Sequence, residues 1–472
     1  MTDSSHQDSV HQGHLDRLTS VDAGFLHVEE DGAHMHIGAL AVFEGPAPSI
    51  HAFRDHISSR LPQLPRYRQR VQEMPLGTGR PVWVEDAHFR LDYHVRHTAL
   101  PAPGSQRELL NLVDRVIGQR LDRSKPLWEM WLVEGLDADR WAIVAKTHHA
   151  MIDGVSGVDL MTVLFDLTPD VANTPPPAWT AAPTPNALEL LTTGATGLVR
   201  NVVDLARDGF SLALHPQEAL RTTVDKVSAL AEATRPLIDS APKSPLNVKP
   251  GPHRLVAIVE TDLADYKLVK ASSGGATVND VVLTAVSGAL GRFLSERGME
   301  IDGLELRACV PVSLRPEAKK GALGNEIAIM NAPLPVGIAD PRARLARVRE
   351  AMEGLKSSKQ AEGAKVLTSL ENALPPAMLA RASRLGFSSR LYNLLVTNVP
   401  GPQLPIYLLG KELVELAPLA FLAPEHSLAI GVMSYNGHVT FGLIADADNL
   451  PDLDRLATHL REALAELVAT AA

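Results

Sequence analysis

Hydrophobic and polar residues along the chain form blocks that predict a mixture of strands and helices. Short apolar runs predict strands, and those in the first part of the chain cover residues 40–43, 128–133 and 141–147. Apolar residues at helical spacing predict helices over residues 50–61 and 109–121. Strands and helices do not alternate regularly here, which disfavours a doubly wound parallel sheet.

The second part of the chain shows the same mixed pattern. Strands are predicted at 255–261, 304–312, 392–399, 429–435 and 439–445, and helices at 263–271, 278–296, 341–357, 366–385 and 450–469. Thr277 is the expected N-cap of the helix at 278–296, and Asn436-Gly437 predicts a type I′ hairpin. The whole pattern predicts an α+β protein built as an α/β sandwich in two halves.

A proline-rich stretch separates the two halves. Residues 169–185 are rich in Pro, Thr and Ala, which is the composition of a surface connector. Helical patterns at 187–208 and 216–238 follow, and a second Pro- and Lys-rich passage covers 241–253. We therefore predict an N-terminal half at 14–170, a Pro-rich and helical linker at 171–253, and a C-terminal half at 254–472.

Composition narrows the class of protein. The 472 residues are 45% hydrophobic and 21% charged, as expected of a soluble globular enzyme. The net charge of -10 comes from residues spread along the chain, without the basic stripe that nucleic-acid binding requires. Residues 1–13 form a polar tail without the features of a secretory signal, and no apolar run is long enough to span a bilayer. These features predict a cytoplasmic protein.

Cysteine chemistry is not expected. Cys309 is the single cysteine, so an intramolecular disulfide is excluded, and its neighbours predict a core position in a strand. A catalytic thiol would need an accessible, electropositive setting, which the sequence around Cys309 does not indicate.

The histidine pair His148-His149 lies where a predicted strand gives way to a helix beginning near Gly154. A neutral imidazole at such a position can accept the proton of a hydroxyl group and later pass it to a thiolate leaving group. Asp153 precedes Gly154, which lets the chain turn sharply and bring the carboxylate back beneath the histidines. This pattern predicts a catalytic base beside a structural carboxylate.

Other interpretations of the pair are open. A histidine in an apolar setting is often a core residue that takes no part in catalysis. A zinc site formed by His148, His149 and Asp153 is disfavoured, because adjacent histidines leaving a strand point to opposite faces and no further ligands cluster nearby. We therefore predict no metal and no bound cofactor.

Several further motifs accompany the histidine pair. The run His148 to Gly154 reads HHxxxDG, and the other segments are Leu18–Leu26, Met35–Gly38, Pro126–Glu129, Asn279-Asp280, Val310–Arg315 and Thr397–Pro402. In this order and spacing, the segments resemble those of the bacterial wax ester synthase/diacylglycerol acyltransferase family. The resemblance covers nearly the whole chain.

The resemblance implies a chloramphenicol-acetyltransferase-like fold of two halves, with the active site in a tunnel between them. It further implies an O-acyltransferase that moves a fatty acyl group from acyl-CoA, a co-substrate, to a lipid alcohol. Diacylglycerol would give triacylglycerol and a long-chain alcohol would give a wax ester. The resemblance leaves open contact with the inner face of a membrane or with a lipid droplet, and it does not predict the oligomeric state.

The family's functional residues carry over by position. His149 becomes the general base and Asp153 the structural carboxylate, while His148 either orients its neighbour, packs, or transfers a proton directly. The residues expected near the substrates are Gly154, Asn279, Asp280, Ser313 and Arg315. Asn279 is either an ordinary helix-start residue or a group that polarises the thioester carbonyl, and Arg315 is either a loop residue or the partner of Asp153.

Two alternative functions are retained. A condensation domain of peptide synthesis shares HHxxxDG and the two-half fold but uses carrier-bound acyl groups. A lipid-binding scaffold without catalysis would keep the fold alone, although it has no chemical need for the motif. The arginines at positions 60, 66, 68 and 70 form the densest basic run, which is either a solvated face or a contact for coenzyme A phosphates or anionic lipid.

Overall fold

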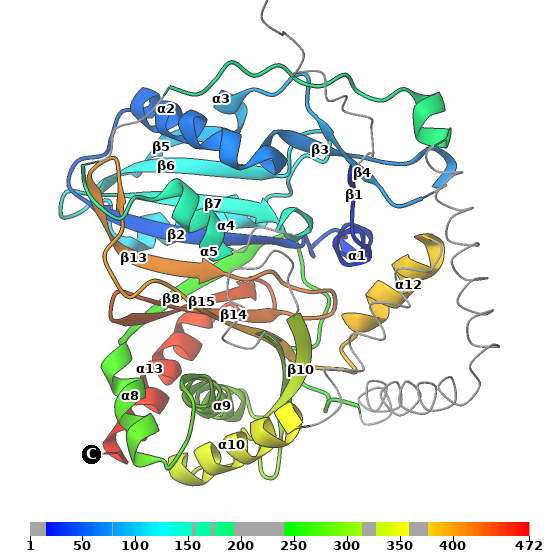
Figure 1. Cartoon of the computed structure of the whole chain (residues 1–472). Coiled ribbons are helices and arrows are strands. Elements are labelled where there is room, and N and C mark those ends of the chain that lie inside the picture. The colour runs from blue at the N-terminus through cyan, green and yellow to red at the C-terminus, as the bar shows by residue number, and fades with distance from the viewer. Residues whose placement is uncertain are drawn as a thin grey trace, which may run out of the picture.

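Two sheets face each other at the centre of the molecule, and helices cover their outer sides (Figure 1). The computed structural model describes residues 16–77, 79–152, 157–170, 175–192, 240–313, 327–357 and 376–471. The predicted mixture of helices and sheets in two halves is confirmed. The predicted linker helices at 187–208 and 216–238 lie outside the described residues, except that 187–192 are helical.

The first sheet has six strands in the order β12-β13-β2-β7-β6-β5. These strands are β2 (His36–Glu44), β5 (Val95–Ala99), β6 (Trp128–Leu136), β7 (Arg140–His148), β12 (Tyr407–Leu408) and β13 (Lys411–Leu419). The helices of this half are α1 (Ser20–Val28), α2 (Ile50–Arg60), α3 (Leu91–His94), α4 (Gln106–Gly118) and α5 (Gly157–Leu164). Helices α2 and α3 lie on the outer side of this sheet (Figure 1).

A small sheet lies beside the first half. It has the order β1-β4-β3 and consists of β1 (Asp16–Arg17), β3 (Gln69–Gln72) and β4 (Val82–Glu85). The Pro- and Arg-rich connector before β3 forms two short 3-10 helices, η1 (Leu61–Gln63) and η2 (Pro65–Arg68), and η3 (Pro75–Gly77) follows β3.

The second sheet has six strands in the order β10-β9-β11-β14-β15-β8. These strands are β8 (Arg254–Asp262), β9 (Leu306–Ser313), β10 (Ile327–Leu334), β11 (Leu394–Pro400), β14 (Leu428–Tyr435) and β15 (His438–Asp446). Its helices are α8 (Leu263–Ser272), α9 (Val278–Glu296), α10 (Pro341–Ser357), α12 (Pro376–Gly386) and α13 (Leu453–Ala469). Helices α8, α9, α10 and α13 cover the side of this sheet that faces away from the first half (Figure 1).

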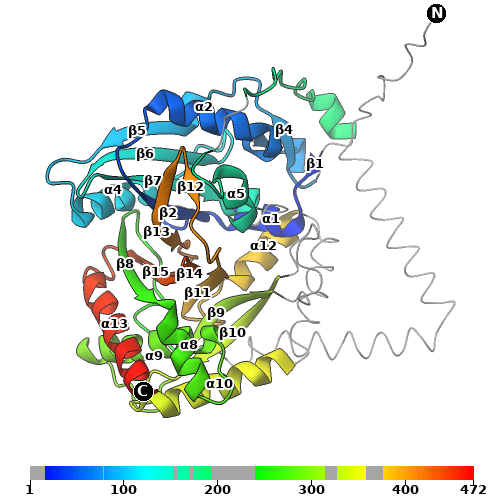
Figure 2. The same ribbon diagram turned by 60° about the vertical axis from the view of Figure 1, so that its left-hand side comes forward.

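Strand β13 joins the two halves. It comes from the C-terminal part of the sequence but pairs antiparallel with β2 of the first sheet, with Leu419 opposite Gly38. Figure 2 shows β12 and β13 rising from the second half to the edge of the first sheet. Neither β13 nor β10 was predicted, and β13 contains an irregular register between Leu413 and Glu415 that breaks the two-residue period of a strand.

Two glycines allow β13 to approach the second sheet. Gly431 of β14 and Gly442 of β15 lie opposite each other in the strand pair. A Cβ atom on Gly442 would lie 1.9 Å from the carbonyl oxygen of Pro418 in β13, and one on Gly431 would lie 2.9 Å from it. Only glycine lacks a Cβ atom, so the glycines at these two positions allow β13 to pack this closely on the second sheet.

The two halves share a hydrophobic core. One buried cluster contains Val113 and Ile117 of α4, Val256 and Ile258 of β8, and Ile444 of β15. Burying a side chain of this size stabilises a fold by about 1.5–3 kcal/mol. The halves are therefore held together by the same kind of packing that stabilises each of them separately.

Several local predictions are confirmed. Helix α9 begins at Val278 and ends at Glu296 as expected, with the Thr277 side chain accepting a hydrogen bond from the Asp280 backbone N–H. Asn436 and Gly437 have φ values of 43° and 89°, as a type I′ hairpin requires. Cys309 is a buried residue of β9, and burial raises its pKa to about 12.

We predict that Gly442→Ala destabilises the protein, because its new methyl group would collide with the Pro418 carbonyl. The expected loss in the free energy of unfolding is about 1–3 kcal/mol, the usual range for overpacking. Gly354→Ala is the control for the added methyl group, since that group would meet no atom within 4 Å, and its place inside α10 is expected to raise stability by about 0.5–1 kcal/mol. Urea unfolding of both variants measures the difference, and an unchanged midpoint for Gly442→Ala would contradict the close approach of β13.

Candidate active site

His149 lies at the turn that follows β7. The strand ends at His148, and η4 (His149–Met151) begins immediately after it. The backbone N–H of His149 donates to the Met35 carbonyl at 2.9 Å, and that of His148 donates to the Leu127 carbonyl at the same distance. These two bonds fix the turn against β2 and β6, so the His149 ring has a defined position at the edge of the sheet.

Two phenylalanine rings contact the His149 imidazole and a third packs against both of them, and we refer to the three rings as the aromatic box. Phe25 of α1 stacks on the imidazole with ring centroids 4.0 Å apart, and Phe421 meets it edge-on at 5.6 Å. Phe387, next to the end of α12, lies 5.9 Å from Phe25 and 6.1 Å from Phe421. The box draws one ring from the first half of the chain and two from the second, so it forms only when the halves associate.

The aromatic box keeps His149 uncharged. Desolvation by burial lowers the pKa of His149 to about 4, because the charged imidazolium loses its hydration among the rings. The residue nevertheless retains intermediate solvent exposure. At neutral pH the ring is therefore a neutral imidazole with one nitrogen free to accept a proton.

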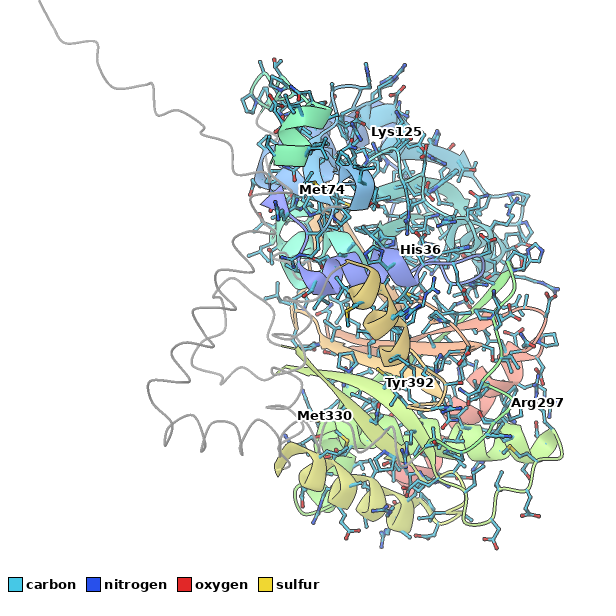
Figure 3. All side chains as sticks on the ribbon, turned by 90° about the vertical axis from the view of Figure 1, so that its right-hand side faces the viewer. His36, Met74, Lys125, Arg297, Met330 and Tyr392 are labelled. Carbon is cyan, nitrogen blue, oxygen red and sulfur yellow. The ribbon has the colours of Figure 1, made fainter. Side chains whose placement is uncertain are left out.

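A narrow cleft adjoins the aromatic box at the junction of the halves. It is lined by His34, Met35, His36, Ile117, Arg254, Ala420, Phe421, Leu422 and Ile444. Its free volume is about 10 Å³, which is enough for a single water molecule. Figure 3 shows His36 beside α1 in the first half and Tyr392 across the junction in the second half. An acyl chain needs more room than this cleft offers, so its entry would require side chains to move.

His148 has surroundings unlike those of His149. Its side chain is 1% exposed, and its Nδ1 atom accepts a hydrogen bond from the Ala150 backbone N–H at 3.1 Å. Desolvation, followed by the charge of Arg123, lowers the pKa of His148 to about 3. This geometry fits the predicted role of orienting His149, because the side chain closes the turn that carries it.

Asn279 and Asp280 lie at the start of α9. The Asp280 carboxylate accepts hydrogen bonds from the backbone N–H and the hydroxyl of Thr277, both at 2.8 Å, which completes a capping box. Asn279 accepts a hydrogen bond at 3.3 Å from the side-chain amide of Asn398 in β11. Two motifs that are far apart in the sequence therefore meet here, although no hydrogen bond or ring contact joins them to His149 within the described residues.

The remaining predicted site residues are not placed. Asp153, Gly154 and Arg315 lie outside the described residues, and so does any pairing between Asp153 and Arg315. The backbone of Ser313 ends β9 and pairs with Ile327 of β10. The substrate contacts expected from these positions stay predictions.

The arginines of the basic run have partners within the protein. Arg60 pairs with Asp166 at 2.5 Å, Arg66 pairs with Asp16 at 2.6 Å, Arg70 donates to Gln72 at 3.0 Å, and the Arg68 guanidinium lies 4.8 Å from the centre of the Trp179 ring. Each of these four guanidinium groups thus already contacts another residue of the protein, which favours a structural role for the basic run over a contact with phosphate.

Sequence reasoning missed most of the aromatic box. Phe25 lies within the opening segment of the chain, but Phe387 and Phe421 belong to no motif. It also missed Glu29, a buried carboxylate whose Oε2 atom lies 3.9 Å from Nε2 of His148. Across the part of the chain that the structure describes, no helix is both long and apolar enough to cross a membrane.

Comparison with known proteins identifies the family. The profile described as "Wax ester synthase/diacylglycerol acyltransferase catalytic domain" matches residues 18–282, and that described as "WS/DGAT C-terminal domain" matches residues 323–468. A Mycobacterium tuberculosis protein named "Probable diacyglycerol O-acyltransferase tgs1" is 32% identical over 467 residues, which cover 96% of each chain.

Solved structures agree with this assignment. A wax ester synthase/diacylglycerol acyltransferase from Marinobacter aquaeolei VT8 is 28% identical, with a TM-score of 0.64 over 96% of this chain and 99% of that one. The first condensation domain of the calcium-dependent antibiotic synthetase shares the fold, with a TM-score of 0.58 at 16% identity over 97% of both chains. The chain belongs to the wax ester synthase/diacylglycerol acyltransferase family.

Proposed function

We propose that the protein transfers a fatty acyl group from acyl-CoA to the hydroxyl group of a lipid alcohol, with His149 as the general base. Family membership supports the acyl transfer. One observation of the structure carries the role of His149: a neutral imidazole with intermediate exposure lies in an apolar box formed by both halves. The acyl acceptor of the proposal is diacylglycerol or a long-chain alcohol.

The reaction follows from the chemistry of this imidazole. A ring nitrogen of His149 takes the hydroxyl proton while the alcohol oxygen attacks the thioester carbonyl carbon. The tetrahedral intermediate collapses, the carbon–sulfur bond breaks, and the imidazolium returns its proton to the departing thiolate. The products are an ester and free coenzyme A, and no acyl-enzyme is formed. The box keeps the base neutral before the attack.

Contact with a lipid surface is part of the proposal. Met378 and Leu385 of α12 are 55% and 61% exposed, and Arg381 and Arg384 of the same helix are exposed as well. Exposed apolar side chains interspersed with arginine suit the headgroup region of an anionic membrane. Since α12 leads directly to Phe387, an acceptor dissolved in such a membrane would be presented near the aromatic box.

His149→Ala is expected to reduce kcat by about 100-fold to 10,000-fold, the usual contribution of general base catalysis. The rate of coenzyme A release from palmitoyl-CoA in the presence of diacylglycerol measures the loss. His97→Ala is the matched control, because His97 is an exposed histidine of β5 that pairs with Glu134 at 3.4 Å. A correctly folded His149→Ala variant with wild-type turnover would remove the base from the mechanism.

The pH dependence of kcat/KM is expected to follow the lowered pKa of His149. The active form is the neutral base, so activity is present above the pKa and is lost as the pH falls through about 4. Initial rates measured after return from each pH to about pH 7 control for unfolding. An inflection at 6.5, the ordinary value for histidine, would show that the box does not depress the pKa of the base.

A substrate panel tests the proposed donor and acceptor. We expect one radiolabelled fatty acyl-CoA, supplied with vesicles that contain diacylglycerol or a long-chain alcohol, to yield labelled triacylglycerol or wax ester. Transfer from a carrier-bound acyl group to an amine, without transfer from acyl-CoA, would instead assign a condensation reaction. Absence of coenzyme A release with every acceptor would leave a lipid-binding scaffold.

A further inference from the structure

A buried carboxylate lies beneath the histidine pair. Glu29 is the C-cap residue of α1, and its side chain is 1% exposed. Arg123 donates to its Oε2 atom through Nε at 2.6 Å, and Arg120 donates to its Oε1 atom through Nε at 3.1 Å. Arg123 also donates to the carbonyl of Leu26 in the last turn of α1. Glu29 and the two arginines, which we call the Glu29 cluster, therefore connect α1 to the segment after α4.

The hydrogen bonds of His148 determine its tautomer. Its Nδ1 atom accepts from the Ala150 backbone N–H, so Nδ1 carries no hydrogen and a neutral ring has its proton on Nε2. This Nε2 atom is buried and has no hydrogen-bond partner within the described residues. It points toward the Glu29 cluster, with Oε2 of Glu29 at 3.9 Å. That distance exceeds a hydrogen bond, so the contact is a charge–dipole attraction between the carboxylate and the Nε2–H group.

The charge of the cluster favours this neutral form. Glu29 attracts the Nε2–H group of His148, while Arg120 and Arg123 together oppose a second proton on the ring. A proton on Nδ1 would face the Ala150 N–H and break the bond that closes the turn. The turn keeps its shape only while His148 is neutral, and His149 is the first residue of η4 in that turn.

The Glu29 cluster also touches the aromatic box through α1. The Glu29 backbone N–H donates to the carbonyl of Phe25 at 3.1 Å, and Phe25 stacks on His149. The Glu29 cluster is thus connected to His149 in two ways, through the turn that His148 closes and through Phe25 near the end of α1. Both connections fix the orientation of the imidazole rather than its chemistry.

We propose that Glu29, held by Arg120 and Arg123, is a positioning residue for acyl transfer, because it orients the Nε2–H group of His148, which burial and the two arginines keep neutral, and thereby fixes the orientation of His149. The inference rests on the proposed function of His149 as the base. Misplacing a catalytic group by about 1 Å costs about 100-fold in rate, so a positioning residue affects turnover strongly without touching the substrate.

Glu29→Gln tests this role. The variant keeps the shape and one acceptor oxygen of the side chain but removes its charge. We expect kcat to fall at least about 10-fold while KM for acyl-CoA and for the acceptor stays within about twofold, since binding is left intact. Glu30→Gln is the matched control: its carboxylate is the neighbouring one, and it lies 3.7 Å from the exposed Lys249. Neither kinetic parameter of the control should change.

A double variant, E29M/R123M, separates positioning from stability. The two substitutions remove the buried carboxylate together with Arg123, whose side chain is 37% exposed, so no buried charge is left without a partner and the variant is expected to melt close to the wild type. Its kcat should still fall at least about 10-fold, because nothing then orients the Nε2–H group of His148. Circular dichroism melts give the folded fraction, by which every rate is divided.

The outcomes distinguish the two proposals. A folded Glu29→Gln or E29M/R123M variant with wild-type kcat, or a loss confined to KM, overturns the positioning role of Glu29. If His149→Ala is inactive in the same assay, the proposed base survives that result. If the wild-type protein shows no transfer from acyl-CoA, or His149→Ala remains fully active, the proposed function itself fails.

Discussion

The pairing of β13 with β2 is the interaction on which the site depends. It brings the end of β13 beside the beginning of β2, with Leu419 opposite Gly38, and the chain then places Phe421 against His149. The close approach at Gly431 and Gly442 sets how the second sheet lies under this strand. Strand β13 pairs with β2 in the first sheet and packs against β14 and β15 of the second sheet. A shift between the halves would therefore move Phe421 relative to His149. The site is therefore complete only when the two halves have assembled.

Desolvation then sets the chemistry. Burial disfavours the charged form of His149, and no charged residue in the described part of the chain shifts its pKa. Such an environment also suits an acyl chain, which is apolar. In the proposed mechanism, the aromatic box would therefore provide both a neutral base and an apolar surface for the acyl chain. The backbone N–H groups of His148 and His149 are hydrogen-bonded to the residues that immediately precede β6 and β2, which holds the turn in place.

The sequence predicted those parts of the fold that local chemistry determines. The N-cap at Thr277 and the hairpin at Asn436-Gly437 have signatures within four residues, and both are present. Strand β13 lacked such a signature, because a register irregularity and Pro418 interrupt its alternation, and its partner lies hundreds of residues away. The same reasoning applies to the site. His149 was predicted from a contiguous motif, whereas Phe421 contacts His149, and Phe387 contacts Phe421, through tertiary packing that no local pattern records.

The two adjacent histidines, His148 and His149, make different contacts. Consecutive residues at the end of a strand point in opposite directions, so His148 faces the interior and His149 faces the aromatic box. The inner position needs a side chain that accepts a hydrogen bond from the Ala150 N–H to close the turn. An aspartate could accept it, but its charge would be buried near Glu29, and a serine would leave the space beside that carboxylate unfilled. A neutral imidazole accepts on one side, presents an N–H to the carboxylate on the other, and adds no charge to a buried site.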